Sequence, residues 1–375
     1  MRFFVATIFA ASLLAQTPAA PPADLDQLLL TARKNYAKGD YAAARESLAT
    51  ALAIVEESPK ENPKRYDVYK QLAGVNSASG DYAKAQEYVE YAINWRETVL
   101  GPTDPGILDD LTEQAMLCNR IKDNARGLAI LNRVYAAHLK SPGYESSAAA
   151  DDQSRMAILY MGDKKPDRAA ECLVIAIRIR EKILGLEHPG LLVELDRLAA
   201  AWIAIQNYPR AEETFRRALV IQERLVGRDS ADLIPTVDGL AYSQFGQKKY
   251  DEAEKNYGRL LGLWISSAGE SHPLVAITLD KIAMFYREQK RMDEAQAAKD
   301  KALALRALFL ANGLAQEAGE QLASPDKEKK KQAEQTYRRA LSVLDPERKE
   351  HDELRKSIEK MLDQLKPAKS RPPTK

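Results

Sequence analysis

The chain has 375 residues, with 55 Lys and Arg against 54 Asp and Glu, so its formal net charge is only +1. This balance argues against nonspecific nucleic-acid binding, which needs a basic surface to displace the counterions of the phosphate backbone. No stretch shows the strict apolar alternation of a half-buried strand, so the predicted elements are all helical.

The first segment in chain order, residues 1–20, has the layout of a secretory signal peptide. Arg2 supplies a positive start, residues 3–15 form an uncharged and mostly apolar run, and an Ala/Pro stretch follows. The run is shorter than the roughly 20 apolar residues that a membrane span requires. We therefore expect export to the periplasm or the extracellular space after cleavage between Ala15 and Ala20. Anchoring by an uncleaved N-terminal segment is the alternative.

From residue 24 onward, small residues recur at a nearly fixed spacing. Six alanines and one glycine, here called the anchors, follow one another at intervals of 41 or 42 residues: Ala44, Ala85, Gly127, Ala169, Ala211, Ala253 and Ala295. Twelve residues before each anchor lies a further alanine: Ala32, Ala73, Ala115, Ala157, Ala199, Ala241 and Ala283. A small side chain at the same two points of each unit indicates a repeat in which two helices approach closely.

Each unit has the pattern of a helical hairpin. In the fifth unit, Leu198 and Trp202 give a first helix, a turn follows at residues 207–209, and Phe215 and Ala218 lie on a second helix. The pattern predicts seven clear hairpins and a divergent eighth, in which residues 333–341 echo residues 211–219. The predicted array covers residues 24–345.

These residues resemble the tetratricopeptide repeat, whose consensus positions are matched in order by Leu198, Ala199, Trp202, Ala211, Phe215 and Ala218. The ordinary repeat has 34 residues, and the longer unit here resembles the kinesin-light-chain type. Its Leu-Gly…His-Pro linker signature stands at residues 184–189, with partial copies at 100–105 and 269–273. The resemblance implies a right-handed superhelical solenoid whose first helices line a groove for a peptide or protein. Repeats of this kind serve many unrelated partners.

The C-terminal segment divides into two parts. Residues 346–365 predict an amphipathic helix that caps the last hairpin, with apolar residues at Leu354, Ile358, Met361, Leu362 and Leu365. Residues 366–375 are rich in Pro and Lys and lack an apolar pattern, so we expect a disordered basic tail.

Evidence for chemistry is sparse. No pair of Cys or His has zinc-ligand spacing, and no phosphate-binding glycine loop or serine nucleophile motif occurs. We therefore predict no enzyme activity, metal or cofactor. His188 and His272 precede prolines at equivalent linker positions, which gives them a structural role. Cys118 and Cys172 are expected to be separate, half-buried thiols, with a disulfide between them as the alternative.

A binding role has better support. By analogy with the family, the residues 15, 11, 8 and 7 positions before each anchor, here called the first-helix face, line the groove. Several of them are apolar: Ile158, Met161, Ile203, Tyr242, Phe245 and Met284. A helix face that only contacts water would be expected to carry polar residues. The apolar residues on the first-helix face therefore predict a surface that binds a partner. In the alternative, Ile203 and Phe245 pack neighbouring first helices together.

Three aspartates form a row on this face. Asp196, Asp238 and Asp280 each lie fifteen residues before an anchor. The kinesin-light-chain pattern has asparagines here that contact the bound peptide's backbone. A carboxylate keeps the acceptor and loses the amide donors, which favours a basic or extended partner that offers N–H groups. Alternatively, an acidic residue near a helix N-terminus suits the helix dipole.

Trp264 stands eleven residues after its anchor, where most repeats have a polar residue. It is a candidate exposed anchor for a partner; alternatively, it covers the linker at residues 266–271. The sequence thus predicts an exported, non-enzymatic scaffold that binds a protein or peptide, without nucleic acid and without stable membrane insertion. A self-associating structural solenoid is the first alternative, and an enzyme with an unrecognised site is the second.

Overall fold

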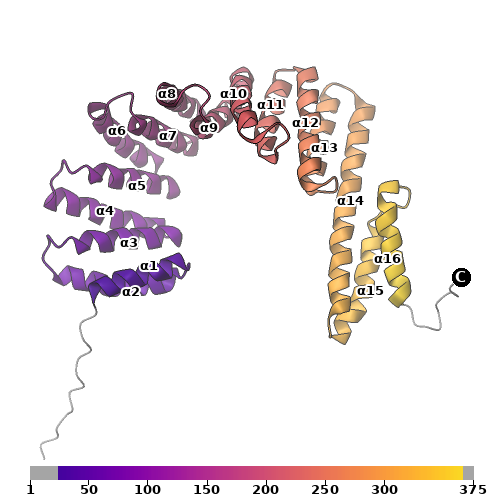
Figure 1. The fold of residues 1–375 in the computed structure, drawn as a ribbon, viewed down its shortest axis with the longest axis horizontal. Helices are drawn as coiled ribbons and strands as arrows, with labels where there is room; N and C mark the ends of the chain where they lie inside the picture. Colours follow the sequence, from indigo (N-terminus) through magenta and orange to yellow (C-terminus); the bar gives the residue numbers. More distant parts are fainter. Residues whose placement is uncertain (1–23, 366–375) are drawn as a thin grey trace, which may run out of the picture. The chain divides into compact units, whose positions relative to one another are not determined.

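The computed structural model describes residues 24–365, which fold into helices and contain no strand within that range. They form two compact units that divide between Ala137 and His138 (Figure 1). The described part of the first unit contains α1 (Leu25–Ala37), α2 (Tyr41–Glu57), α3 (Lys64–Ala78), α4 (Tyr82–Val99), α5 (Gly106–Arg120) and most of α6 (Asn124–Lys140).

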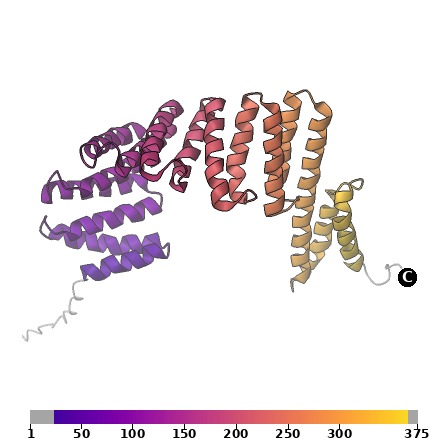
Figure 2. The ribbon, with the colours of Figure 1, turned by 45° about the horizontal axis from the view of Figure 1, so that its top comes forward.

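The second unit begins at the end of α6. It contains α7 (Ser147–Gly162), α8 (Pro166–Leu184), η1 (Pro189–Leu191), α9 (Leu192–Ala204), α10 (Tyr208–Val226), η2 (Ala231–Leu233), α11 (Ile234–Gly246), α12 (Tyr250–Ala268), α13 (Pro273–Glu288), α14 (Met292–Ala323), α15 (Lys327–Ser342), η3 (Lys349–His351) and α16 (Asp352–Leu365). Consecutive helices pack against each other, and α11 to α14 lie side by side in Figure 2. These elements confirm the all-α architecture of stacked helical hairpins.

The repeated small residues occupy the helix contacts that the sequence predicts. All seven anchors are buried, and so are six of the seven alanines that lie twelve residues earlier. Ala283 is the exception, because it is only partly buried. Because these residues have at most one side-chain carbon, the two helices of each hairpin can lie close together. The larger apolar side chains of the hairpin then interdigitate.

The turn within each hairpin has a fixed geometry. Five residues before each anchor, the backbone is left-handed, with positive φ at Gly39, Gly80, Lys122, Lys164, Gln206, Lys248 and Lys290. Aspartate or asparagine then caps several second helices. For example, Asp40 accepts a hydrogen bond from the amide of Ala43 at 3.0 Å, and Asn207 accepts one from Arg210 at 3.4 Å.

The eighth hairpin departs from the regular pattern. α14 has 32 residues and continues without a turn from the second helix of the seventh hairpin into the first helix of the eighth. Its C-terminal half packs against α15, which contains residues 333–341, and α16 adds Ile358 to the same apolar cluster. Leu354, Met361, Leu362 and Leu365 of α16 are partly buried against this cluster.

Two of the predicted segments, the signal peptide at residues 1–20 and the basic tail at residues 366–375, lie outside the described residues. Within residues 24–365, no helix combines the length and apolarity that crossing a membrane requires.

Candidate functional site

The first helices of the second unit expose part of the predicted apolar surface. Tyr242 of α11 is 44% exposed and Met284 of α13 is 57% exposed, whereas Ile203 and Phe245 are partly buried. The ring of Phe245 lies 5.9 Å from that of Phe285 and joins the core cluster of the sixth hairpin. Tyr242 and Met284 are therefore available to a partner, while Phe245 mainly supports the core.

The three aspartates of the row differ in their surroundings. Lys281 of α13 donates to both carboxylate oxygens of Asp238, at 2.7 and 2.6 Å. Arg306 of α14 pairs with Asp280. Among the described residues, Asp196 has neither an ion pair nor a hydrogen bond through its side chain. The row therefore contains two neutralised carboxylates and one that is exposed and unpaired.

The register of the repeat explains why Asp196 is unpaired. Asp238 pairs with the residue 43 positions later, on the next first helix, and the equivalent residue for Asp196 is Gly239. A Cβ atom at position 239 would lie 2.2 Å from the ring of Phe215. A side chain at position 239 would therefore have to displace the phenyl ring, and the glycine supplies no cation to Asp196.

The position of Asp196 also affects its titration. Its carboxylate is accessible, yet desolvation by the surrounding protein raises its pKa above the ordinary value. Raised pKa values without a compensating cation indicate a carboxylate that would gain from a cationic or N–H-donating ligand. Tyr242 lies at the next first helix, with its ring 6.0 Å from that of Tyr208 in an edge-on arrangement.

Trp264 is packed against the protein in the structure. It is partly buried, lies against the core clusters on either side of α12, and stacks on His272 with ring centroids 5.9 Å apart and planes 14° apart. His272 belongs to the linker that follows α12, so packing against this linker accounts for the tryptophan.

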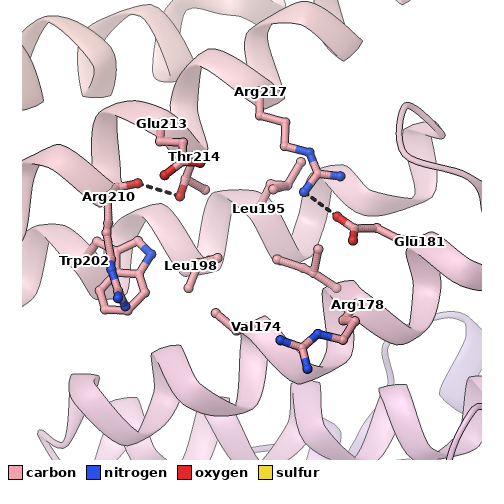
Figure 3. Close-up of a pocket in the computed structure, with 11 residues that line it drawn as sticks. Val174, Arg178, Glu181, Leu195, Leu198, Trp202, Arg210, Glu213, Thr214 and Arg217 are labelled. Atoms are coloured by element: carbon pink, nitrogen blue, oxygen red, sulfur yellow. Dashed lines mark hydrogen bonds and ion pairs between the residues drawn. The ribbon is translucent and has the colours of Figure 1, made fainter.

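A hollow of about 470 Å³ lies on the opposite side of the hairpins, between α8, α9 and α10 (Figure 3). Its floor is apolar, with Leu195 and Leu198, and its rim is charged. The guanidinium of Arg210 covers the ring of Trp202 at 4.7 Å, and Arg217 pairs with Glu181. The equivalent hollow between α12, α13 and α14, 84 residues later, has a volume of about 530 Å³. These hollows therefore follow from the repeat geometry.

The histidines and cysteines have structural environments. Nδ1 of His188 accepts from the amide of Gly190 at 3.0 Å, and Nδ1 of His272 accepts from that of Leu274 at 3.3 Å, so both cap the helical turn that follows. Cys118 and Cys172 are free and buried, and burial raises the pKa of both thiols, that of Cys172 to about 11. No group of three potential metal ligands occurs within residues 24–365.

Sequence reasoning did not identify the two cations that neutralise the aspartate row. The signal for Lys281 was present, because it stands 43 residues after Asp238, at the position where the sixth repeat has Gly239. Arg306 gave no comparable signal, since its partner Asp280 lies within the same hairpin. The charged hollow at Arg210 and Trp202 was also missed, because its residues come from three helices.

Comparison with known families supports the repeat assignment. Tetratricopeptide repeat models match residues 153–190 and 195–232, and a further tetratricopeptide repeat model matches residues 233–307. A comparison with curated proteins gave no significant match.

Several solved structures are similar in fold. Tetratricopeptide-like repeats of a candidate kinesin light chain from Podosopora anserina are 21% identical, with a TM-score of 0.49, covering 55% of this chain and 98% of that one. BtubC from P. vanneervenii is 18% identical with a TM-score of 0.47, over 64% and 92% of the two chains. The quorum sensor NprR from B. thuringiensis is 12% identical with a TM-score of 0.46, over 75% and 87%. The matched family models and the 42-residue period of the buried anchors show that residues 153–190, 195–232 and 233–307 consist of tetratricopeptide repeats, in a long form that resembles the kinesin-light-chain type.

Proposed function

We propose that the protein is a non-enzymatic scaffold that binds a basic, extended peptide segment of a partner protein on the first-helix face of its second unit. Repeat arrays of this fold typically act as scaffolds for protein interactions, and function has to be argued from the site itself. The observation that carries the proposal is Asp196, an exposed carboxylate without a cation in a row where its two equivalents are paired.

The surroundings of Asp196 suit an extended ligand. Ala200, one helical turn after Asp196 on α9, has only a small side chain, and Tyr242 offers an exposed aromatic surface on the next first helix. A lysine or arginine of the ligand would replace the missing cation, and an apolar or aromatic side chain would pack on Tyr242. Aromatic residues in such positions supply much of the affinity at protein interfaces.

We further propose that the protein is exported, as its N-terminal sequence indicates. Sequencing of the mature N-terminus in the native host tests this. A new N-terminus between residues 16 and 21 is expected, and an intact Met1 in the soluble cytoplasmic fraction would contradict export.

Binding can be tested with arrayed synthetic peptides of defined charge. The wild-type chain should retain lysine- or arginine-containing extended peptides in preference to acidic ones. The Asp196→Asn variant preserves shape and should weaken this binding about three- to tenfold and reduce its salt dependence. Asp251→Asn, which removes an exposed aspartate from α12, is the matched control and should leave binding unchanged. Equal binding by wild type and Asp196→Asn would reject the proposed site.

The principal alternative is self-association of the solenoid. Size-exclusion chromatography with light scattering separates the two functions, because the proposed scaffold should remain monomeric over a wide range of concentrations while it binds peptide. Concentration-dependent oligomers that Tyr242→Ala abolishes would instead assign the same face to contacts between copies.

A further inference from the structure

The seventh hairpin, α13 with the N-terminal half of α14, has a face that lacks the helix which covers the corresponding face in other repeats. In the first and fourth hairpins, a small hollow at this register is closed by the next first helix. Gln71 and Gly74 of α3 close the hollow of 180 Å³ over the first hairpin, and Arg197 and Ala200 of α9 close that of 190 Å³ over the fourth.

The corresponding hollow of the seventh hairpin is larger and has no such wall. It has a volume of about 350 Å³, and its lining residues, which include Ala283, Met284 and Lys299, come only from α13 and α14. The reason is that α14 runs straight on into the eighth hairpin, so no first helix turns back over this surface.

Burial of equivalent residues supports this interpretation. The residue eight positions after each anchor is apolar in all seven repeats, and it is buried or partly buried in six of them: Leu52, Ile93, Tyr135, Ile177, Leu219 and Leu261. The seventh, Leu303, is 52% exposed. Ala283 is likewise the only alanine of its set that is not fully buried. Leu303 and Ala283 thus have the side chains that pack against a neighbouring first helix in other repeats, but no such helix covers them.

The charges around this face indicate what would cover it. Four residues after the anchor, six repeats have a buried or partly buried apolar or aromatic residue, whereas the seventh has the exposed Lys299. Arg287 and Arg306 are also at this hairpin, against two nearby acids: Asp280, which pairs with Arg306, and Asp300, which accepts a hydrogen bond from Gln296 at 2.9 Å. The face therefore carries excess positive charge around an apolar strip.

Arg306 also occupies a position at which other repeats bind the next first helix. Eleven residues after the anchor, Arg96 pairs with Asp110 at 2.8 Å, His138 contacts Asp152 at 2.6 Å, and Arg180 pairs with Glu194 at 3.3 Å.

The carboxylates in these three pairs belong to the covering helices, five residues before a buried alanine: Ala115, Ala157 and Ala199. Among the described residues, no helix supplies the corresponding carboxylate to Arg306, which folds back onto Asp280 instead.

We propose that this face, defined by Met284, Lys299, Leu303 and Arg306, is a docking site for an acidic amphipathic helix of a partner protein. The helix would have a carboxylate five residues before an alanine, so that the acid meets Arg306 and the alanine allows close approach. The chain's own residues 366–375 do not fit, because they carry four Lys or Arg and no acid. The site is separate from the proposed peptide site at Asp196 and does not depend on it.

A suitable probe is a fluorescein-labelled peptide with the sequence of α5, Gly106–Arg120, with Cys118 replaced by serine. It contains the required spacing at Asp110 and Ala115, and its three acids and one arginine make it acidic. Fluorescence anisotropy with the full chain should show binding, and the Asp110→Asn peptide should bind about three- to tenfold more weakly.

Variants of the full chain locate the binding site. Leu303→Glu and Lys299→Glu should each weaken peptide binding at least tenfold, because they place an acid against the acidic helix. Leu310→Glu is the matched control, since Leu310 lies on the same helix and is 51% exposed but stands beyond Arg306, towards the eighth hairpin. Asp196→Asn should leave peptide binding unchanged, which separates this site from the proposed function.

Three results would overturn the proposal: no binding of the α5 peptide, equal binding by Leu303→Glu and Leu310→Glu, or tighter binding of the Asp110→Asn peptide. Light scattering tests whether a second copy of the chain occupies this face instead. A concentration-dependent dimer that Leu303→Glu abolishes would show that a second copy of this chain, and not a partner helix, covers the face.

Discussion

Glu212 of α10 joins the fifth hairpin to the sixth through a cluster of hydrogen bonds. Its side chain is only 5% exposed and accepts from Gln247 and Lys249 at 2.7 Å each, and from Arg216 at 2.6 Å. Burial alone would raise its pKa, but the hydrogen bonds from Lys249 and Arg216 outweigh burial and lower the pKa to about 2. The carboxylate therefore stabilises the contact between neighbouring repeats.

This interaction should depend on pH. A carboxylate whose folded pKa is depressed contributes its full stability above the unfolded pKa, here 4.5, and loses it as the pH falls towards 2. Glu212→Gln should therefore lower the free energy of unfolding at pH 7 by about 1–3 kcal/mol, a range reduced for the partial exposure of Lys249 and Arg216.

Urea denaturation of wild type and variant at pH 7 and pH 3 measures this difference, which should shrink at the lower pH. Glu213→Gln, at the exposed neighbouring position, serves as the control and should show a negligible difference at both pH values. An equal loss for Glu212→Gln at pH 7 and pH 3 would mean that the charge of Glu212 does not stabilise the fold.

The left-handed turn residues allow a second prediction. Lys164 has φ of 58° and is exposed, and side chains with a Cβ atom are strained in this conformation. Lys164→Gly should raise the free energy of unfolding by about 0.5–1 kcal/mol, whereas Lys164→Ala should not raise it. Denaturant midpoints measure both. A loss of stability in the glycine variant would show that the turn is not left-handed in solution.

At the scale of the helices, the alanine positions make the sharpest prediction because one of them is uncovered. Ala199 is fully buried, so Ala199→Leu should overpack its helix contact and cost about 1–3 kcal/mol. Ala283 occupies the equivalent position of the open seventh hairpin and is only partly buried. Ala283→Leu should therefore cost less than about 0.5 kcal/mol. Equal losses in the two variants would mean that a helix covers Ala283 in solution.

The sequence predicts most of the helical elements because their contacts recur. Anchor alanines and turns at a 42-residue period specify seven hairpins independently of any single residue, and every anchor is buried as expected. The fused helix α14 was not predicted. Sixteen residues after the anchors of the second to sixth repeats, one to three residues past the end of the second helix, stands a glycine with positive φ: Gly101, Gly143, Gly185, Gly227 and Gly269.

The seventh repeat has Ala311 at that position. Alanine is the strongest helix former and resists the left-handed conformation, so the helix continues through it. This signal was readable in the sequence from the register alone.

The candidate site was predicted less completely than the fold. Position relative to the anchors identified Asp196, Asp238 and Asp280, but not which of them is paired. Pairing depends on side chains of neighbouring helices, such as Lys281 across from Asp238 and Phe215 against Gly239. Exposure of apolar residues also depends on neighbours, as the buried contact of Phe245 and the open surface of Met284 demonstrate.

At the scale of the whole molecule, the two sides of the stacked hairpins in the second unit differ in the side chains that they expose. The second-helix side contains charged hollows that follow from the repeat geometry, with Arg217 and Glu181 already paired. The first-helix side carries the unpaired Asp196 and the exposed Tyr242. The central claim is therefore that partners bind to the first-helix side of the second unit.

Site-specific photo-crosslinking in the native host tests this claim most directly. A benzoylphenylalanine replaces Tyr242 on α11 in one variant and Val220 on α10, which is 46% exposed on the second-helix side, in the other. We expect a protein crosslink from position 242 that Asp196→Asn reduces, and none from position 220. Crosslinks from position 220 alone, or from position 242 with no effect of Asp196→Asn, would contradict the claim.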